Sequence, residues 1–231
     1  MNIETFPDAL SVASAAASFI AKQSRAAIAA RGRFVVALSG GSTPWLMLRC
    51  LAREDMQWNA LEIVQVDERV APAGDPERNL THVHEHLLKN TPLQREQIHA
   101  MPVEGKDLET AAAEYVQMLS KLAGSPPVLD LVHLGIGVDG HTASLVPGDA
   151  VLGVIEWDVA VTGIYQNRRR MTLTYPILNR ARQVLWLVTG EEKAEMLHRL
   201  RDGDHSIPAG RVRQDRAAIF ADRAAAGGET A

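Results

Sequence analysis

The stretch "RFVVALSGGSTPWLMLRCLA", residues 33–52, contains the pattern that decides the fold. Its first part, residues 33–39, is apolar at consecutive positions, which is typical of a strand covered on both faces of a sheet. Two glycines then allow a tight turn, and the residues from Ser42 onward have helical spacing, with Pro44 expected at the first helical position. A strand, a glycine turn and a helix in this order form the repeating unit of a parallel α/β sheet.

The same alternation of strand and helix continues along the chain. Further apolar runs that are typical of strands lie at residues 61–67, 129–135, 158–164, 183–190 and 217–222. Helical patterns lie at residues 9–31, 43–52, 79–89, 107–122 and 191–203. The first helix has Asp8 as its expected N-cap and is expected to end near Gly32. We therefore predict a three-layer α/β/α fold, with a mostly parallel, Rossmann-like sheet and helices on both faces.

Composition limits the classes of protein that the chain can belong to. It shows no internal repeat and no low-complexity linker, so residues 1–231 are predicted to form a single α/β domain. The 24 Lys and Arg against 28 Asp and Glu give a net charge of −4 without a long basic run, so no nucleic-acid partner is expected. The single cysteine, Cys50, excludes an internal disulfide and a paired-cysteine zinc site, and it fits a reducing, cytoplasmic location. Without a basic N-terminal signal or an apolar run of about 20 residues, we expect neither export nor a membrane partner.

The glycine loop at residues 39–44 suits a phosphate group. At the predicted carboxyl edge of the sheet, its glycines expose backbone N–H groups, and Ser42 and Thr43 add hydroxyls at the positive end of the helix dipole. An alternative is that Ser42 or Thr43 only caps the helix. The loop lacks the lysine of a Walker motif, so a nucleoside triphosphate is not implied.

A second glycine loop, "GIGVDGHTASLVPG" at residues 135–148, has the GxGxxG spacing of a dinucleotide-binding site. Asp139, however, places a carboxylate between the second and third glycines, where it would repel a pyrophosphate. The acidic residues Glu156 and Asp158 precede the next strand instead of following it, so the ribose contact is missing as well. We therefore expect no nucleotide cofactor, and the informative residues of this loop are Asp139 and His141.

Charged residues stand at three further places near the predicted edge. Arg168, Arg169 and Arg170 precede the alternating run "MTLTY", Lys193 lies in the first turn of a helix, and Asp67, Glu68 and Arg69 end a strand. Arginine forks and lysine ammonium groups are common phosphate partners, and ligands of α/β proteins bind at the carboxyl ends of strands. The alternatives are that the arginine run is a solvated edge, that Lys193 pairs with a helix acid and that Asp67 caps a turn.

Three further histidines are expected to have structural roles. His82 and His86, one helical turn apart, have the spacing of a zinc pair, but no third ligand is evident nearby. This favours a polar helix face, and no metal site is expected. His133 lies in an apolar strand and is expected to be a hydrogen-bonded core histidine.

Five motifs together carry a resemblance that none of them carries alone. They are "LSGGSTP" (38–44), "VDERVAP" (66–72), "GIGVDGHTASLVPG" (135–148), "RMTLTYPILNRA" (170–181) and "VTGEEKAEML" (188–197). In this order they resemble the 6-phosphogluconolactonase family, which is related to the glucosamine-6-phosphate deaminases. The resemblance implies a NagB/RpiA/CoA transferase-like fold. It also implies hydrolysis of 6-phospho-D-glucono-1,5-lactone to 6-phosphogluconate in the oxidative pentose phosphate pathway, without metal or nucleotide.

The resemblance implies a role for each candidate residue. The phosphate is expected at Gly40, Gly41, Ser42 and Thr43, together with Arg169 or Arg170 and with Lys193. His141 is the expected general base, because an imidazole can accept a proton near neutral pH. Asp67 and Asp139 are both candidates to orient the imidazole or the sugar. Arg69 is a candidate for contacts to the carbonyl or hydroxyl groups, and Asn79 for shaping the adjacent loop.

The chain departs from the family pattern at two places. Residues 166–170, "QNRRR", replace a Lys-Pro-rich segment, which leaves open the choice among Arg168, Arg169 and Arg170 for the phosphate. Arg78 stands where a serine is commoner. Both departures concern the placement of the ligand more than the type of reaction.

Two alternative functions remain open in the sequence. A glucosamine-6-phosphate deaminase would need a glutamate just before Pro147, where this chain has Val146, a residue that cannot carry a proton. A non-catalytic sugar-phosphate sensor would keep the phosphate loop but could dispense with His141. The expected partner is a small sugar-phosphate lactone, and the chain is expected to be a monomer or a weak homo-oligomer.

Overall fold

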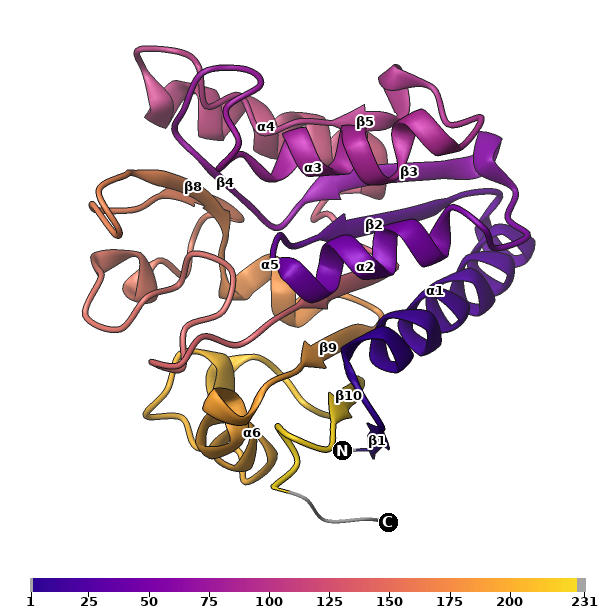
Figure 1. Cartoon of the computed structure of the whole chain (residues 1–231). Coiled ribbons are helices and arrows are strands. Elements are labelled where there is room, and N and C mark those ends of the chain that lie inside the picture. The colour runs from indigo at the N-terminus through magenta and orange to yellow at the C-terminus, as the bar shows by residue number, and fades with distance from the viewer. Residues whose placement is uncertain (1, 228–231) are drawn as a thin grey trace.

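The computed structural model, which describes residues 2–227, has a seven-stranded parallel sheet at its centre (Figure 1). The strand order is β1-β10-β9-β6-β2-β3-β5, and each neighbouring pair is parallel. The strands are β1 Asn2–Phe6, β2 Phe34–Leu38, β3 Leu61–Gln65, β5 Ile98–His99, β6 Leu131–Leu134, β9 Val184–Val188 and β10 Ala217–Asp222. All five residues of β2 are buried, as its uninterrupted apolar run predicted.

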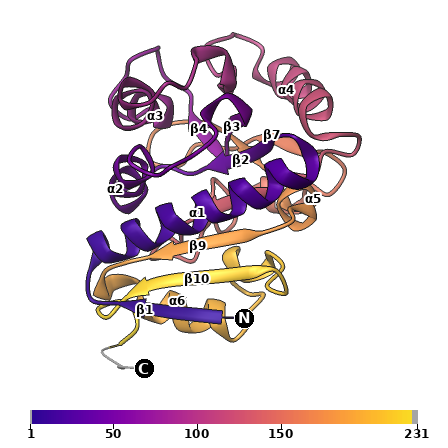
Figure 2. The same ribbon diagram turned by 90° about the vertical axis from the view of Figure 1, so that its right-hand side faces the viewer.

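Helices cover both faces of this sheet. One face carries α1 Ala9–Arg31, α2 Ser42–Leu51 and α3 Asn79–His86, and the other carries α4 Leu108–Ala123, α5 Tyr175–Arg180 and α6 Ala194–Arg201. Figure 2 shows α1 lying across the sheet. Side chains along a strand alternate between the two layers, so Val36 packs on the side of α1 and α2, and Val35 packs on the side of α4. The predicted three-layer α/β/α fold is therefore confirmed.

A second, three-stranded antiparallel sheet lies beside the carboxyl edge of the main sheet. Its order is β4-β8-β7, formed by Asp67–Arg69, Arg170–Leu173 and Val159–Val161 (Figure 1). The sequence places two of these segments in the parallel sheet, with residues 67–69 at the end of the preceding strand and residues 158–164 as a further strand. Their backbone groups instead pair with β8, which places Arg69 directly opposite Arg170.

Short helical turns link the main elements. They are the 3-10 helices η1 Trp58–Ala60, η2 Leu88–Asn90, η3 Arg95–Gln97, η4 Ala150–Gly153, η5 Glu191–Lys193 and η6 Ala209–Arg211. The segment expected as one helix from residue 191 is therefore a 3-10 turn followed by α6. Within residues 2–227, no helix is both long and apolar enough to cross a membrane.

The caps of two helices test the predicted boundaries. Asp8 caps α1 by accepting the Ser11 N–H at 2.8 Å, and Gly32 ends that helix with a left-handed φ of 76°, as predicted. At α2 the prediction was wrong by two residues: Gly41 is the N-cap, so Pro44 is the third helical residue instead of the first. The glycine turn therefore leads directly into the helix without a side-chain cap.

Candidate active site

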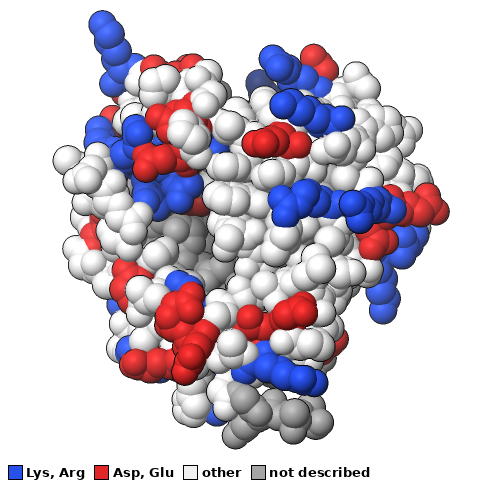
Figure 3. Space-filling model, viewed as in Figure 1, with Lys and Arg blue, Asp and Glu red and all other residues white. Residues whose placement is uncertain are grey.

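A cavity of about 280 Å³ opens at the carboxyl ends of β2, β3, β6 and β9. It lies beside the neighbouring strands β2 and β6, where the order of the strands in the sheet reverses. Open α/β sheets bind their ligands at such a reversal point. Figure 3 shows the surface hollowed at this edge, between the small sheet and α6. The predicted residues that line the cavity are Gly40, Gly41, Ser42, Thr43, Asp67, Arg69, Asn79, His141, Arg170 and Lys193.

The loop between β2 and α2 lines the cavity together with the first turn of α2. Gly41 has a φ of 129°, a conformation that favours glycine, and no side chain caps the first turn of α2. The alternative that Ser42 or Thr43 only caps the helix is therefore wrong. Thr43 instead shares a hydrogen bond of 2.6 Å with the hydroxyl of Thr189, which ties this loop to the end of β9.

Asn79 links the glycine loop to the small sheet. Its side-chain N–H group donates to the backbone oxygen of Asp67 at 2.9 Å, and its carbonyl oxygen accepts from Arg69 at 2.6 Å. Gly40 packs so closely on this amide that a Cβ at Gly40 would lie 1.8 Å from Asn79 Oδ1. Asp67 is held on its other side by Ser144, whose hydroxyl donates to Oδ2 at 2.6 Å. These contacts fix the buried Asp67 carboxylate at the cavity wall.

Glu68 and Arg78 form a buried charge pair behind the cavity. Glu68 is fully buried and accepts the backbone N–H groups of Arg69, Asn79 and Leu80, so it anchors β4 to the start of α3. Arg78 Nε lies 3.3 Å from this carboxylate. Arg78, which departs from the family pattern, therefore compensates the charge of Glu68 and does not line the cavity.

His141 and Asp139 form a hydrogen-bonded pair. His141 Nδ1 lies 2.5 Å from Asp139 Oδ1, which also accepts the backbone N–H of His141 at 3.1 Å. Partial burial opposes the charge of Asp139, but the hydrogen bonds from His141 outweigh it and hold the pKa of Asp139 below its usual value. A Cβ at Gly137 would lie 2.1 Å from Nδ1, so this glycine makes room for the imidazole. Asp139, and not Asp67, is the carboxylate that contacts His141.

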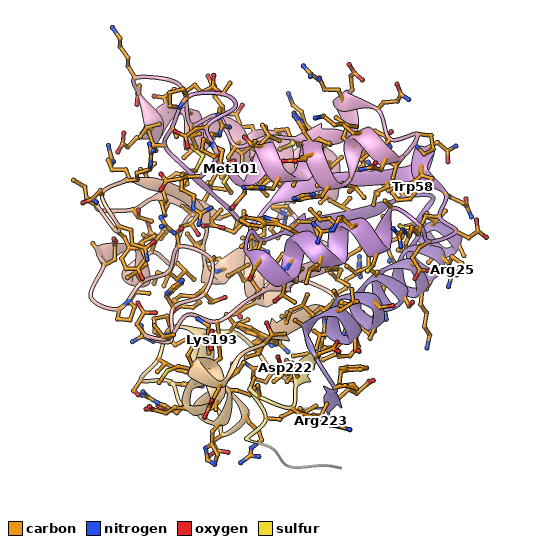
Figure 4. The ribbon with its side chains drawn as sticks, in the orientation of Figure 1. Arg25, Trp58, Met101, Lys193, Asp222 and Arg223 are labelled. Atoms are coloured by element: carbon orange, nitrogen blue, oxygen red, sulfur yellow. The ribbon has the colours of Figure 1, made fainter. Side chains whose placement is uncertain are left out.

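Three cations line the cavity without a carboxylate partner in the described part of the chain. Arg170 is 5% exposed and donates to Gln166 Oε1 at 2.9 Å, and burial lowers its pKa. Arg69 donates to Asn79 and to a backbone oxygen, but it makes no ion pair within residues 2–227. Lys193 precedes α6, and Figure 4 places it between that helix and the loops after β6. Cations without partners in a recess favour an anionic ligand.

Neither neighbouring arginine lines this cavity, although Arg168 lines an adjoining recess together with Arg69 and Arg170. Arg169 lies 2.6 Å from Glu109 on α4, and Arg168 pairs with Asp75 and Glu77. Successive side chains of a strand face opposite sides, which is why Arg170 enters the cavity and Arg169 does not. The structure therefore does not bring Arg169 to the site where the sequence predicted it.

The loop that carries Lys193 is held by a residue that the sequence analysis missed. Both carboxylate oxygens of Asp222, at the end of β10, lie 3.1 Å from the backbone nitrogen of Gly190 (Figure 4). Gly190 has a φ of 97°, which favours glycine. The only signal in the sequence was an acidic residue at a strand end.

The remaining histidines lie outside the cavity. His82 stacks on Trp45 with ring centroids 3.8 Å apart, and its ring nitrogens lie in a cluster with Glu85 and His86 whose ligand atoms are within 4.8 Å of one another. Glu85 is thus a third possible ligand that the sequence analysis did not identify. His133 is fully buried, and burial lowers its pKa to about 3. Its Nδ1 accepts from the Ser39 N–H at 3.3 Å, but Nε2 has no partner among the described residues, so the expectation of a fully hydrogen-bonded histidine was only half right.

Comparison with known proteins establishes the family. The model of the family described as glucosamine-6-phosphate isomerases/6-phosphogluconolactonase matches residues 7–221. The chain belongs to this family. The chain is 36% identical to the 6-phosphogluconolactonase of Mycobacterium tuberculosis over 97% of each chain.

Two solved structures have the same fold as this family member. A 6-phosphogluconolactonase from Shewanella baltica has a TM-score of 0.84 at 27% identity, covering 96% of this chain and 97% of that one. A monomeric glucosamine-6-phosphate deaminase has a TM-score of 0.86 at 19% identity, covering 99% and 100%. The fold therefore does not separate the two activities, whereas the predicted family and fold are both confirmed.

Proposed function

We propose that this family member hydrolyses 6-phospho-D-glucono-1,5-lactone to 6-phospho-D-gluconate, a step of the oxidative pentose phosphate pathway. The observation that carries the proposal is the His141–Asp139 pair on a cavity that also holds three cations without carboxylate partners. Lactone hydrolysis requires a base for water, a site for the phosphate dianion and stabilisation of a developing oxyanion. The names of the curated relatives support the same substrate.

We assign the phosphate group to the start of α2. The N–H groups of the first turn have no intrahelical acceptor, and the positive end of the helix dipole faces the same space. Arg170 and Lys193 supply two positive charges to the cavity. The close contact between Gly40 and Asn79 keeps the loop in the shape that presents these donors.

The chemical step assigned to His141 is removal of a proton from water. Asp139 accepts from Nδ1, which leaves Nε2 without a hydrogen-bond partner among the described residues and free to accept that proton. The oxygen of the activated water bonds to C1 of the lactone, and the bond from C1 to the ring oxygen breaks. The ring oxygen takes a proton to become the 5-hydroxyl, and C1 becomes a carboxylate, so one water is consumed and one proton is released.

Arg69 and Asp67 are assigned to the sugar. Arg69 lines the cavity and has a buried Nε without a partner among the described residues, so it can donate to the lactone carbonyl as negative charge develops. Asp67 accepts from Ser144 and Asn79 but makes no hydrogen bond to His141 within the described chain. Its carboxylate is therefore assigned to the hydroxyl groups of the sugar.

The deaminase alternative is disfavoured by one position in the second glycine loop. The deaminase reaction needs an additional proton carrier, and the corresponding Val146 is apolar and only 8% exposed. The sensor alternative is disfavoured by the His141–Asp139 pair, which a protein that only binds a sugar phosphate does not require.

A coupled assay with freshly generated 6-phosphogluconolactone tests the function, with the uncatalysed hydrolysis subtracted and glucosamine 6-phosphate run in parallel. We expect lactone hydrolysis and no deamination. His141→Ala should reduce kcat by about a hundredfold or more while binding of 6-phosphogluconate persists. His198→Ala, which changes an exposed histidine on α6, is the matched control. Activity of His141→Ala within about tenfold of the parent protein would assign the base to another residue.

We further propose a cytoplasmic enzyme that works as a monomer or a weak homo-oligomer. The single cysteine supports a reducing compartment, because secreted proteins more often carry paired cysteines. Light scattering after size-exclusion chromatography would measure the assembly state, and a mass well above one chain at micromolar concentration would contradict a monomer or a weak oligomer.

A further inference from the structure

Tyr165 occupies a defined position in a tight hairpin ahead of β8. Its backbone pairs with that of Arg168, with hydrogen bonds of 3.0 and 3.3 Å in the two directions. The two residues between them, Gln166 and Asn167, have φ values of 50° and 64°, the left-handed conformation of a two-residue hairpin turn. The turn therefore fixes the direction in which the Tyr165 side chain leaves the backbone.

The side chain of Tyr165 contacts both parts of the candidate active site. Its hydroxyl donates to Asp139 Oδ2 at 3.2 Å, while His141 contacts Oδ1 of the same carboxylate. Its ring lies edge-to-face with the imidazole of His141, with centroids 5.6 Å apart. The guanidinium carbon of Arg170 lies over the Tyr165 ring, 5.0 Å from its centroid.

We propose that Tyr165 is a positioning residue for the reaction: its hydroxyl orients Asp139 against His141, and its ring holds Arg170 at the cavity wall. This inference rests on the function proposed above. Burial and the nearby Asp139 raise the pKa of Tyr165, so its hydroxyl stays protonated at neutral pH and can act as a donor. One side chain thereby links the base to a phosphate-binding cation.

The hydroxyl of Tyr165 and the imidazole of His141 bind different oxygens of the Asp139 carboxylate. With Tyr165 present, one carboxylate oxygen is hydrogen-bonded by the phenol and the other by the imidazole. Without the phenol, the carboxylate would interact more strongly with His141 and stabilise its protonated form. The other charged groups that face His141 across the cavity are Asp67, Arg69, Arg170, Glu192 and Lys193. They are unchanged when only the hydroxyl is removed.

Tyr165→Phe removes the hydroxyl and keeps the ring over Arg170. We expect kcat to fall about threefold to tenfold while KM stays within about twofold. The acidic limb of the kcat/KM profile should move to higher pH. Tyr165→Leu also removes the ring, so KM should rise about tenfold in addition. Tyr175→Phe is the matched control, because the hydroxyl of Tyr175 donates to Pro208 outside the cavity.

The titration of His141 can be followed by NMR without any turnover, its signal being identified by loss in His141→Gln. A higher midpoint in Tyr165→Phe than in the parent protein supports the proposal, and an unchanged midpoint overturns it. An unchanged KM in a folded Tyr165→Leu, verified by its thermal unfolding, overturns the role of the ring. If the parent protein does not hydrolyse the lactone, the proposed function fails, whereas the NMR midpoint still decides whether Tyr165 acts on the Asp139–His141 pair.

Discussion

Asp139 Oδ1 accepts hydrogen bonds from both the ring and the backbone of His141, with His141 Nδ1 at 2.5 Å. Because the acceptor lies only two residues before the histidine, a single tight loop determines both the direction of the imidazole and the nitrogen that carries its proton. His141, the proposed general base, is therefore held by a carboxylate of its own loop, which Tyr165 also contacts, and it makes no hydrogen bond to Asp67 within the described chain.

Asp139→Asn should leave the loop in place but offer His141 an amide instead of a carboxylate. The amide stabilises a protonated imidazole less and can favour the wrong tautomer, so we expect kcat to fall by about a hundredfold to ten-thousandfold. Steady-state kinetics would measure this loss. Asp202→Asn, which changes the exposed Asp202–His198 pair on the surface, should retain full activity. Equal effects of the two substitutions would argue against a role for Asp139 in positioning the base.

Arg170→Ala should mainly weaken substrate binding, because its guanidinium lines the cavity. We expect KM to rise about tenfold or more, with a smaller change in kcat. Arg169→Ala removes the neighbouring guanidinium, which pairs with Glu109 outside the cavity, and should change KM by less than about twofold. A larger effect at Arg169 than at Arg170 would reverse the assignment of the phosphate ligand.

Gly137→Ala tests the packing of the imidazole. The new Cβ would lie 2.1 Å from His141 Nδ1, so the ring must move away from its bond with Asp139. We expect kcat to fall by about a hundredfold, since small displacements of a catalytic group have effects of this size. Gly153→Ala is the control, because a Cβ there meets no atom within 4 Å. Activity of Gly137→Ala equal to that of the control would show that the ring tolerates this displacement.

His133 predicts a pH dependence of stability. Burial lowers its pKa to about 3, whereas the unfolded chain binds this proton near pH 6.5. The contribution of His133 to the free energy of unfolding is therefore complete above about pH 6.5. Below that pH the free energy of unfolding decreases by about 1.4 kcal/mol per pH unit because of this residue alone. Urea unfolding between pH 7 and pH 5 would measure the slope. His133→Gln should unfold with a shallower dependence on pH, and an unchanged slope would assign the effect to other groups.

The sequence predicted the structure best where a segment's conformation depends on residues close to it in the chain. The long apolar runs predicted the central strands because strands covered on both faces need no polar face. β5 has only two residues and α5 only six, so neither has enough length to show a period, and both were missed. The partner of residues 158–164 could not be predicted, because it depends on backbone pairing with β8 and not on local hydrophobicity.

In the candidate site, too, local features were predicted and contacts between distant segments were not. The glycine loop, Asp139 and His141 were singled out because each lies within one short motif, but the sequence left open whether Asp67 or Asp139 contacts the imidazole. Ser144, Asp222 and Tyr165 were missed, and their partners are 77, 32 and 26 positions away in the chain. Only the folded chain brings these side chains to Asp67, Gly190 and Asp139.

The register of the small sheet has a consequence for stability. Arg69 stands directly opposite Arg170, and burial together with the positive charge of Arg69 lowers the pKa of Arg170. An anionic ligand would relieve the repulsion between these two cations. By mass action, the proposed product 6-phosphogluconate at a hundred times its Kd should add about 2.7 kcal/mol to the free energy of unfolding. Thermal unfolding with and without the product would measure this gain. At the same product concentration, Arg170→Met should reduce the gain. In the absence of ligand, the same variant should have a higher melting temperature than the parent protein. Ligand binding is thus expected to set the stability of the folded protein, and the chain without the proposed product is expected to be the form that unfolds most readily.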